Sequence, residues 1–97
     1  MRREEAIKQL ANNLPELRNQ YGVAGLSIFG SVARNQANAD SDLDVLIDFA
    51  TTPGLLRYIE LKTHLENLLG IPVDIVTRKA LKQQLRDTIL SEAIRVC

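Results

Sequence analysis

The segment LDVLIDF, residues 43–49, constrains the fold of this chain more than any other stretch. Apolar residues at every second position predict a strand with one apolar side, formed by Leu43, Val45, Ile47 and Phe49. The other side of that strand, extended by one residue, would carry Asp42, Asp44, Leu46 and Asp48. A small domain would therefore place acids at the entrance to its own core.

The remaining patterns predict a small sheet covered by helices. Further strands are predicted at residues 26–29, bounded by Gly25 and Gly30, and at residues 73–76. Polar residues 35–41 predict a loop between the first two strands. Apolar residues at helical spacing predict four helices: around residues 7–14, residues 17–21 up to Gly22, residues 55–69 up to Gly70, and residues 80–96. This order of elements predicts an α+β, or mixed α/β, fold.

Two of these helices are predicted from residues that recur at helical spacing. In the helix at residues 55–69, this period is formed by Leu55, Ile59, Lys62, Leu65, Glu66 and Leu69. In the last helix, Leu81, Leu85, Ile89 and Ala93 lie on one stripe. The helices are expected to cover the sheet.

Composition limits the classes of function. With 97 residues, 45% of them hydrophobic, the chain is expected to form one domain over residues 1–97. A formal net charge of zero and 4% aromatic residues argue against sequence-blind nucleic-acid binding. Cys97 is the only cysteine, which favours a reducing compartment. Without a signal peptide or an apolar run of about 20 residues, the chain is expected to be cytoplasmic.

Asp42 and Asp44 are the first candidate site residues. Residues two apart on a strand project to one face, roughly 6.6 Å apart, so their carboxylates would share one volume. Like charges held so close repel unless a cation lies between them, and oxygen ligands favour Mg²⁺ or Mn²⁺. A zinc site is not expected from His64 and Cys97, which are far apart in sequence. The alternative is an ordinary turn and strand entry, where Asp and Ser are common.

Asp74 favours the metal site over the turn. It is a third acid, on another short apolar strand, where an unpaired charge is costly. Three carboxylates on two strands predict a site for two metal ions.

The Gly30-Ser31 pair is a candidate phosphate site. Gly30 allows the backbone to approach a ligand closely, and the amides after it, with the Ser31 hydroxyl, can face a phosphate. A plain turn after a strand is the alternative. The position of the pair, about ten residues before Asp42, favours the phosphate site.

Three short motifs resemble those of the nucleotidyltransferase superfamily that includes DNA polymerase β. They are GSVAR at residues 30–34, SDLD at residues 41–44 and VDIV at residues 73–76. The short chain is similar, almost end to end, to the minimal nucleotidyltransferase (MNT) domains of that superfamily. The resemblance implies an enzyme that transfers a nucleoside monophosphate to a hydroxyl group and releases pyrophosphate.

The resemblance also implies roles for individual residues. Asp42 and Asp44 would bind the metal ions that hold the nucleoside triphosphate. Asp74 would complete the metal site, with removal of the acceptor's proton as a second role left open. Gly30 and Ser31 would hold the β- and γ-phosphates.

For a protein of this size, the resemblance implies a role in a toxin-antitoxin system. Such an antitoxin transfers AMP from ATP to a tyrosine of a HEPN-domain ribonuclease toxin and so silences it. Two alternatives stay open: an antitoxin that neutralises its toxin by binding alone, and a transferase that acts on a small molecule or RNA. The missing acceptor domain and the few aromatic residues argue against the latter.

Other residues allow two interpretations each. Arg34 is a candidate for contact with phosphate or the partner, or for an ion pair with the acidic loop. Asp48 is expected to pair with a helix residue rather than to bind the metal, and His64 is expected to be lightly packed or solvated. A basic cluster is a candidate for partner docking or nucleotide steering, or a solvated helix face: Arg78, Lys79, Lys82 and Arg86.

Overall fold

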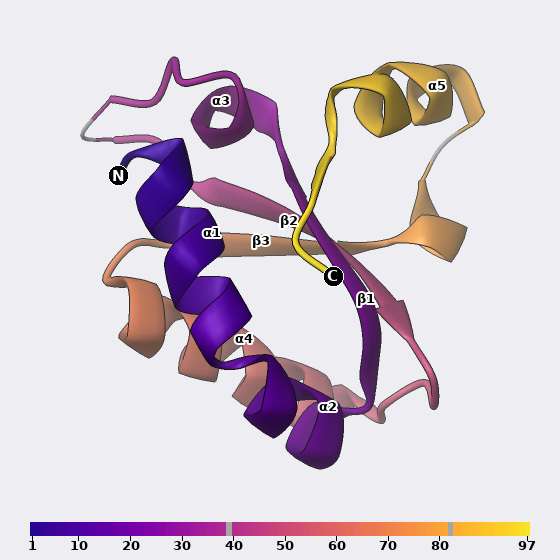
Figure 1. Ribbon diagram of the computed structural model, residues 1–97. Helices are drawn as coiled ribbons and strands as arrows, with labels where there is room; N and C mark the ends of the chain where they lie inside the picture. Colours follow the sequence, from indigo (N-terminus) through magenta and orange to yellow (C-terminus); the bar gives the residue numbers. More distant parts are fainter. Residues whose placement is uncertain (39, 82) are drawn as a thin grey trace.

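A four-stranded sheet forms the centre of the computed structural model, which describes residues 1–38, 40–81 and 83–97 (Figure 1). The strands are β1 (Val23–Phe29), β2 (Leu43–Phe49), β3 (Val73–Thr77) and β4 (Ile94–Arg95), in the order β3-β2-β1-β4. Strand β1 is antiparallel to β2 and to β4, whereas β2 and β3 are parallel. The mixed sheet with helices confirms the predicted fold class.

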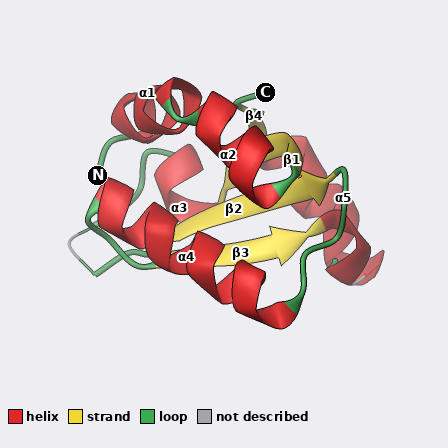
Figure 2. Ribbon diagram, turned by 90° about the horizontal axis from the view of Figure 1, so that it is seen from below, coloured by secondary structure: helices red, strands yellow, loops and turns green. Residues whose placement is uncertain are grey.

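Helices lie on both sides of this sheet. They are α1 (Arg3–Asn12), α2 (Leu14–Tyr21), α3 (Gly30–Ala33), α4 (Leu55–Leu69) and α5 (Gln83–Glu92), with a 3-10 turn, η1 (Arg78–Ala80). Figures 1 and 2 show α1, α2 and α4 on one side and α3 and α5 on the other. Gly22 and Gly70 end α2 and α4 in the left-handed conformation, as predicted. No helix in the described part of the chain combines the length and apolar character that crossing a bilayer requires.

The alternation predicted for β2 is confirmed. Leu43, Val45 and Ile47 are buried in the core that α1, α2 and α4 close, whereas Asp44 and Asp48, on the opposite side, are only partly buried. Leu46 shares the side of the acids but is 2% exposed. The second side of the sheet is therefore covered at its middle row and accessible toward both ends of β2.

Strand β1 is longer than predicted. It begins at Val23 instead of residue 26, and the pairing with β2 shifts register between Val23 and Gly25. Gly25 was predicted to bound the strand, but it lies within it, at a bulge that glycine accommodates. The prediction failed because a bulge continues the strand through a residue that usually ends one.

The prediction of a helix through residues 80–96 is wrong at both ends. The chain first makes the turn η1, and α5 ends at Glu92, after which Ile94–Arg95 pair with Ile28 and Ser27 of β1. The backbone amides of Val96 and Cys97 then donate to the Leu26 carbonyl. These bonds satisfy the edge of β1, which a continued helix would leave unpaired.

The periodic residues of these two helices are not all buried. In α4, Leu55 is 74% and Ile59 50% exposed, and the buried positions are Leu61, Leu65 and Leu69. In α5, Leu85 is 53% exposed, and none of the described side chains of that helix is buried. Helix α5 lies beside α3 and away from the main core, so its period has no core to face.

Candidate active site

The three predicted acids lie where β2 and β3 begin. The parallel register of these strands places Asp44 directly beside Asp74, and residues paired in this way project to the same face. Asp42 precedes β2 by one residue and lies two residues before Asp44, so it extends the same row. Asp42 and Asp74 are exposed, whereas Asp44 is partly buried.

Helix α4 and the chain before β3 fix the position of Asp74. The Val73 amide donates a hydrogen bond of 3.0 Å to the Glu66 carboxylate of α4. The Leu43 amide donates one of 2.9 Å to the Pro72 carbonyl, which joins the starts of β2 and β3. These two bonds set the level at which Asp74 and Asp44 stand side by side.

Gly30 packs directly against Asp44. It has a φ of +75°, and a Cβ atom built on it would collide with the Oδ2 atom of Asp44. The carboxylate therefore occupies the space where any other residue would carry its side chain. Ser31 follows as the second residue of α3, so the structure brings the predicted Gly30-Ser31 pair to the predicted acids.

The electrostatic environment of Asp44 favours a cation. Burial raises the pKa of the Asp44 carboxyl group, and the charges of Asp74 and Asp42 raise it further. The Arg34 guanidinium lowers this pKa, and Glu92 raises it. The one cation in this group thus faces four carboxylates.

Arg34 is held by two partners. Its Nη1 atom donates to the Glu92 carboxylate at 2.9 Å, and its Nε atom donates to the Gln36 side-chain oxygen at 3.1 Å. The ion-pair interpretation of Arg34 is confirmed in kind, although the partner is Glu92 of α5 rather than the acidic loop. Sequence reasoning missed Glu92, because no motif marks it and its segment joins the sheet through long-range pairing.

The donor set fits a hard divalent cation. Among the described residues, no group of three His, Cys, Asp or Glu side chains is close enough to hold a metal ion by itself. All three predicted acids offer oxygen ligands, and Asp44 carries a charge that burial and its neighbours disfavour. Mg²⁺ is commonly held by one or two carboxylates together with substrate phosphates, which an incomplete protein cage allows.

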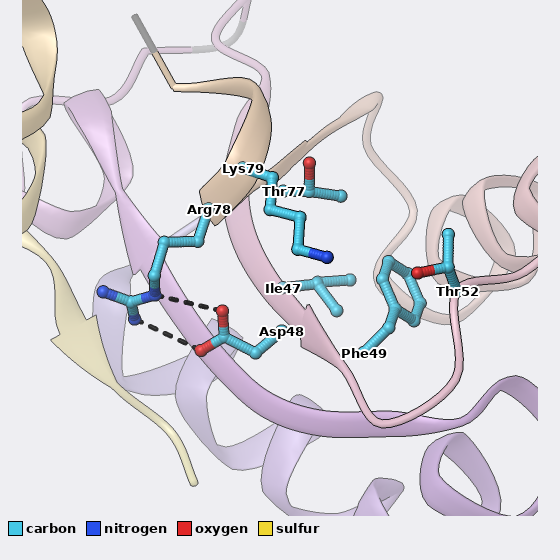
Figure 3. Close-up of a pocket in the computed structure, with 7 residues that line it drawn as sticks. All are labelled: Ile47, Asp48, Phe49, Thr52, Thr77, Arg78 and Lys79. Atoms are coloured by element: carbon cyan, nitrogen blue, oxygen red, sulfur yellow. Dashed lines mark hydrogen bonds and ion pairs between the residues drawn. The ribbon is translucent and has the colours of Figure 1, made fainter. Parts of the chain in front are cut away.

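The other candidates lie away from this cluster. Asp48 accepts two hydrogen bonds from Arg78, at 3.0 and 3.2 Å, which confirms the expected pairing with a helix residue (Figure 3). His64 lies 3.8 Å from the Glu16 carboxylate and stacks near Tyr21, as expected for a lightly packed histidine. Of the predicted basic cluster, Arg78, Lys79 and Arg86 are exposed, and Lys82 lies outside the described residues.

A cavity of about 140 Å³ lies at the opposite end of the strands. Its lining includes Ile47, Phe49, Thr77 and Lys79, with the Asp48–Arg78 pair at its side (Figure 3). It contains none of the predicted site residues. We place the candidate active site at the acids, because several carboxylates lie there, whereas the one carboxylate that lines this cavity is bound by Arg78.

The chain is similar in sequence and in fold to known nucleotidyltransferases. Residues 7–96 match the nucleotidyltransferase domain family. The chain is 43% identical over 93 residues to the protein adenylyltransferase MntA of Thermococcus cleftensis, covering 96% of this chain and 94% of that protein. A solved minimal nucleotidyltransferase structure superposes with a TM-score of 0.79 at 40% identity, covering 97% of this chain and 95% of the other.

A more distant structure shares the fold. It is the tri-AMPylated HEPN toxin of Shewanella oneidensis in complex with an MNT antitoxin, with a TM-score of 0.67 and 19% identity. The match covers 94% of this chain and 71% of the matched one.

Proposed function

Since this chain belongs to the nucleotidyltransferase domain family, we propose that it is an antitoxin that transfers AMP from ATP to a tyrosine of a HEPN ribonuclease toxin. The observation that carries this proposal is the alignment of Asp44 with Asp74, beside Asp42 and against Gly30. The 43% identity to a protein adenylyltransferase, over nearly the whole chain, supports the choice of AMP and of a protein acceptor.

Asp42, Asp44 and Asp74 would hold Mg²⁺ or Mn²⁺ together with the phosphates of ATP. When bound, the metal would polarise the phosphoryl oxygens and offset the charge of the leaving pyrophosphate. The raised pKa of Asp44 supports this role, because the partly buried carboxylate has three negative groups and one positive group among its charged neighbours. The exposed Asp42 and Asp74 leave the site open on the side from which a ligand would enter.

Gly30, Ser31 and Arg34 would bind the triphosphate. Gly30 opens α3 in contact with Asp44, and the Ser31 hydroxyl that follows it is a donor for a phosphate oxygen. Arg34 brings a guanidinium group to the neighbourhood of Asp44. A planar guanidinium suits two phosphate oxygens at once.

The transfer itself replaces one phosphorus–oxygen bond with another. The acceptor oxygen forms a bond to the α-phosphorus of ATP, and the bond from that phosphorus to the bridging oxygen breaks, releasing pyrophosphate. The acceptor hydroxyl loses its proton, for which Asp74 is the candidate base, since it is exposed beside Asp44.

The acceptor in this proposal is a partner protein. The related MNT antitoxin of Shewanella oneidensis is in complex with an AMPylated HEPN toxin, which supports a HEPN partner for this chain. A HEPN toxin would bring its own acceptor hydroxyl to the open side of the acids. We infer that both proteins act in the cytoplasm, where ATP is available.

Intact mass spectrometry tests the proposal. The HEPN toxin encoded beside this protein is incubated with it, ATP and Mg²⁺, and compared with reactions of Asp42→Asn and Asp48→Asn. We expect wild type and Asp48→Asn to add one or more AMP units to the toxin, and Asp42→Asn to add none. The two variants make the same chemical change along one strand, so Asp48→Asn controls for charge and folding.

Other outcomes would contradict the proposal. Equal AMP addition by Asp42→Asn would remove the metal site from the reaction. A stable complex with an unmodified toxin would indicate an antitoxin that acts by binding alone. An AMP-bearing product formed without any protein partner would indicate a small-molecule or RNA acceptor.

A further inference from the structure

Arg34 reaches the acids in a defined orientation because other side chains hold it. Its side chain is 46% exposed, so solvent alone would leave the guanidinium free to rotate. The bonds to Glu92 and Gln36 use the Nη1 and Nε atoms, on opposite edges of the planar group, and neither bond uses Nη2. A guanidinium has five N–H donors, so others remain for a ligand.

Glu92 comes to this point from the far end of the chain. It is the last residue of α5, and its side chain is 24% exposed, so it is better enclosed than Arg34. The next residues are fixed by the pairing of Ile94 and Arg95 with β1. The backbone of Glu92 is therefore anchored to the same strand that ends at Phe29 and leads into Gly30.

We propose that Glu92 is a positioning residue for ATP: it holds the Arg34 guanidinium beside Asp44, ready for the triphosphate. This inference rests on the proposed function and assigns a role to a residue outside the three motifs. Glu92 acts through Arg34 and does not itself bind the nucleotide.

Because Glu92 is negatively charged, the direction in which its replacement changes ATP affinity distinguishes positioning from simple repulsion. A carboxylate near a triphosphate repels it, and without a positioning role its removal would tighten ATP binding. Positioning predicts the reverse, because the freed Arg34 side chain must lose more rotamer freedom when ATP binds. The two effects oppose each other, and we expect the positioning effect to be larger.

Isothermal titration calorimetry of MgATP binding tests the direction of this change in affinity. We expect Glu92→Ala to weaken binding about three- to fivefold, the range of a single exposed or half-exposed ion pair. Glu92→Gln keeps an acceptor oxygen for Arg34 and should recover most of the affinity. Asp87→Ala, an exposed acid on the same helix, makes the same charge change and should leave binding unchanged.

Kinetics and a double variant separate positioning from a structural role. With toxin as acceptor, Glu92→Ala should raise the KM for ATP about as much as the Kd, with kcat changed less than about twofold. In an Arg34→Gln background, adding Glu92→Ala should have no further effect on binding. Equal losses in both backgrounds, or tighter binding by Glu92→Ala and Glu92→Gln, would overturn the inference.

The wild-type measurements distinguish failure of the inference from failure of the proposed function. A wild type that binds MgATP but leaves the toxin unmodified overturns AMP transfer, and the binding series then decides the role of Glu92. A wild type that does not bind MgATP overturns both.

Discussion

Asp44 and Asp48 are the same residue type on the same face of β2, four positions apart, yet their surroundings are opposite. Asp44 is partly buried among Asp74, Asp42 and Glu92, and its pKa is raised. Asp48 accepts two hydrogen bonds from one edge of the Arg78 guanidinium, and this contact raises the pKa of Arg78. At one end of the strand an arginine pairs with the carboxylate, whereas at the other end the carboxylate has more negative than positive neighbours.

Each aspartate also faces a glycine on β1 or just after it. A Cβ atom at Gly30 would collide with the Asp44 carboxylate, whereas one at Gly25 would lie 3.1 Å from that of Asp48. The first contact has no spare room, and the second has a little. Tight packing therefore coincides with unbalanced charge, as is typical of positions kept for chemistry rather than for stability.

The largest expected difference between the two ends is in activity. Asp44→Asn should lower the rate of AMP transfer about a thousandfold, because a lost metal ligand costs several kcal/mol of transition-state stabilisation. Asp48→Asn should change the rate less than about twofold. Transfer to the toxin, followed by mass spectrometry over time, gives both values, and similar losses in the two variants would break the comparison.

The glycines should differ next. Gly30→Ala should lower the free energy of unfolding by about 2–4 kcal/mol, through a strained backbone and an overpacked contact with Asp44. Gly70→Ala shares the positive φ but has no atom within 4 Å of the added Cβ, so it should cost about 1–2 kcal/mol. Gly25→Ala, with an ordinary φ, should cost the least.

Urea denaturation measures all three variants. The excess of Gly30→Ala over Gly70→Ala isolates the contact with Asp44. If the two variants were equally stable, the carboxylate would have moved away at no cost, and the close packing at this end would not constrain the site.

A smaller effect is expected in how the free energy of unfolding depends on pH, because of the charges around Asp44. The folded-state pKa of Asp44 is raised above 3.8, so above pH 3.8 the folded protein holds more of this proton than the unfolded chain. As pH rises from 3.8 through the raised pKa, this group therefore lowers the free energy of unfolding, and the loss is then complete. Asp44→Asn removes that loss, so its advantage over wild type should grow with pH across this interval.

Denaturation curves in the presence of a chelator, at a series of pH values, test this expectation. Parallel pH profiles for wild type and Asp44→Asn would show that the acid cluster is not under electrostatic strain.

The smallest expected effect is the loss of folding stability when the Asp48–Arg78 ion pair is removed. Both side chains of the Asp48–Arg78 pair are more than 40% exposed, so Asp48→Asn should cost less than about 1 kcal/mol. The cost should shrink further in high salt. Urea denaturation at two ionic strengths measures it, and a cost of several kcal/mol would mean that this pair holds η1 and β3 together.

Local patterns predicted the start of β2 well and its distant partners poorly. Three features were predicted correctly because each depends on neighbours in sequence. They are the alternation at residues 43–49, the helix ends at Gly22 and Gly70, and the strand around Asp74. The structure brings Asp42, Asp44, Asp74, Gly30 and Arg34 into one region, while their roles in binding stay predictions.

The misses share a physical cause. Ile94 has the same local sequence whether it continues a helix or joins β1, and the unpaired edge of β1 decides between them. Glu92 enters the site only because of that pairing. Likewise, the period of α4 includes Leu55 and Ile59, but the sheet lies under other positions of the helix. Which part of a stripe is buried depends on where the helix ends up, which periodicity does not encode.

The place of β4 at the outer edge of β1 also orders events during synthesis of the chain. A ribosome makes Asp42 roughly 50 residues before Glu92, an interval of about 3 to 10 seconds at ordinary rates of translation. During that interval β1 and β2 can pair, but β4 does not yet exist. It is the pairing of β4 with β1 that anchors Glu92 near Arg34. The order of synthesis is therefore Asp42 and Asp44 first, Asp74 later, and the partner of Arg34 last.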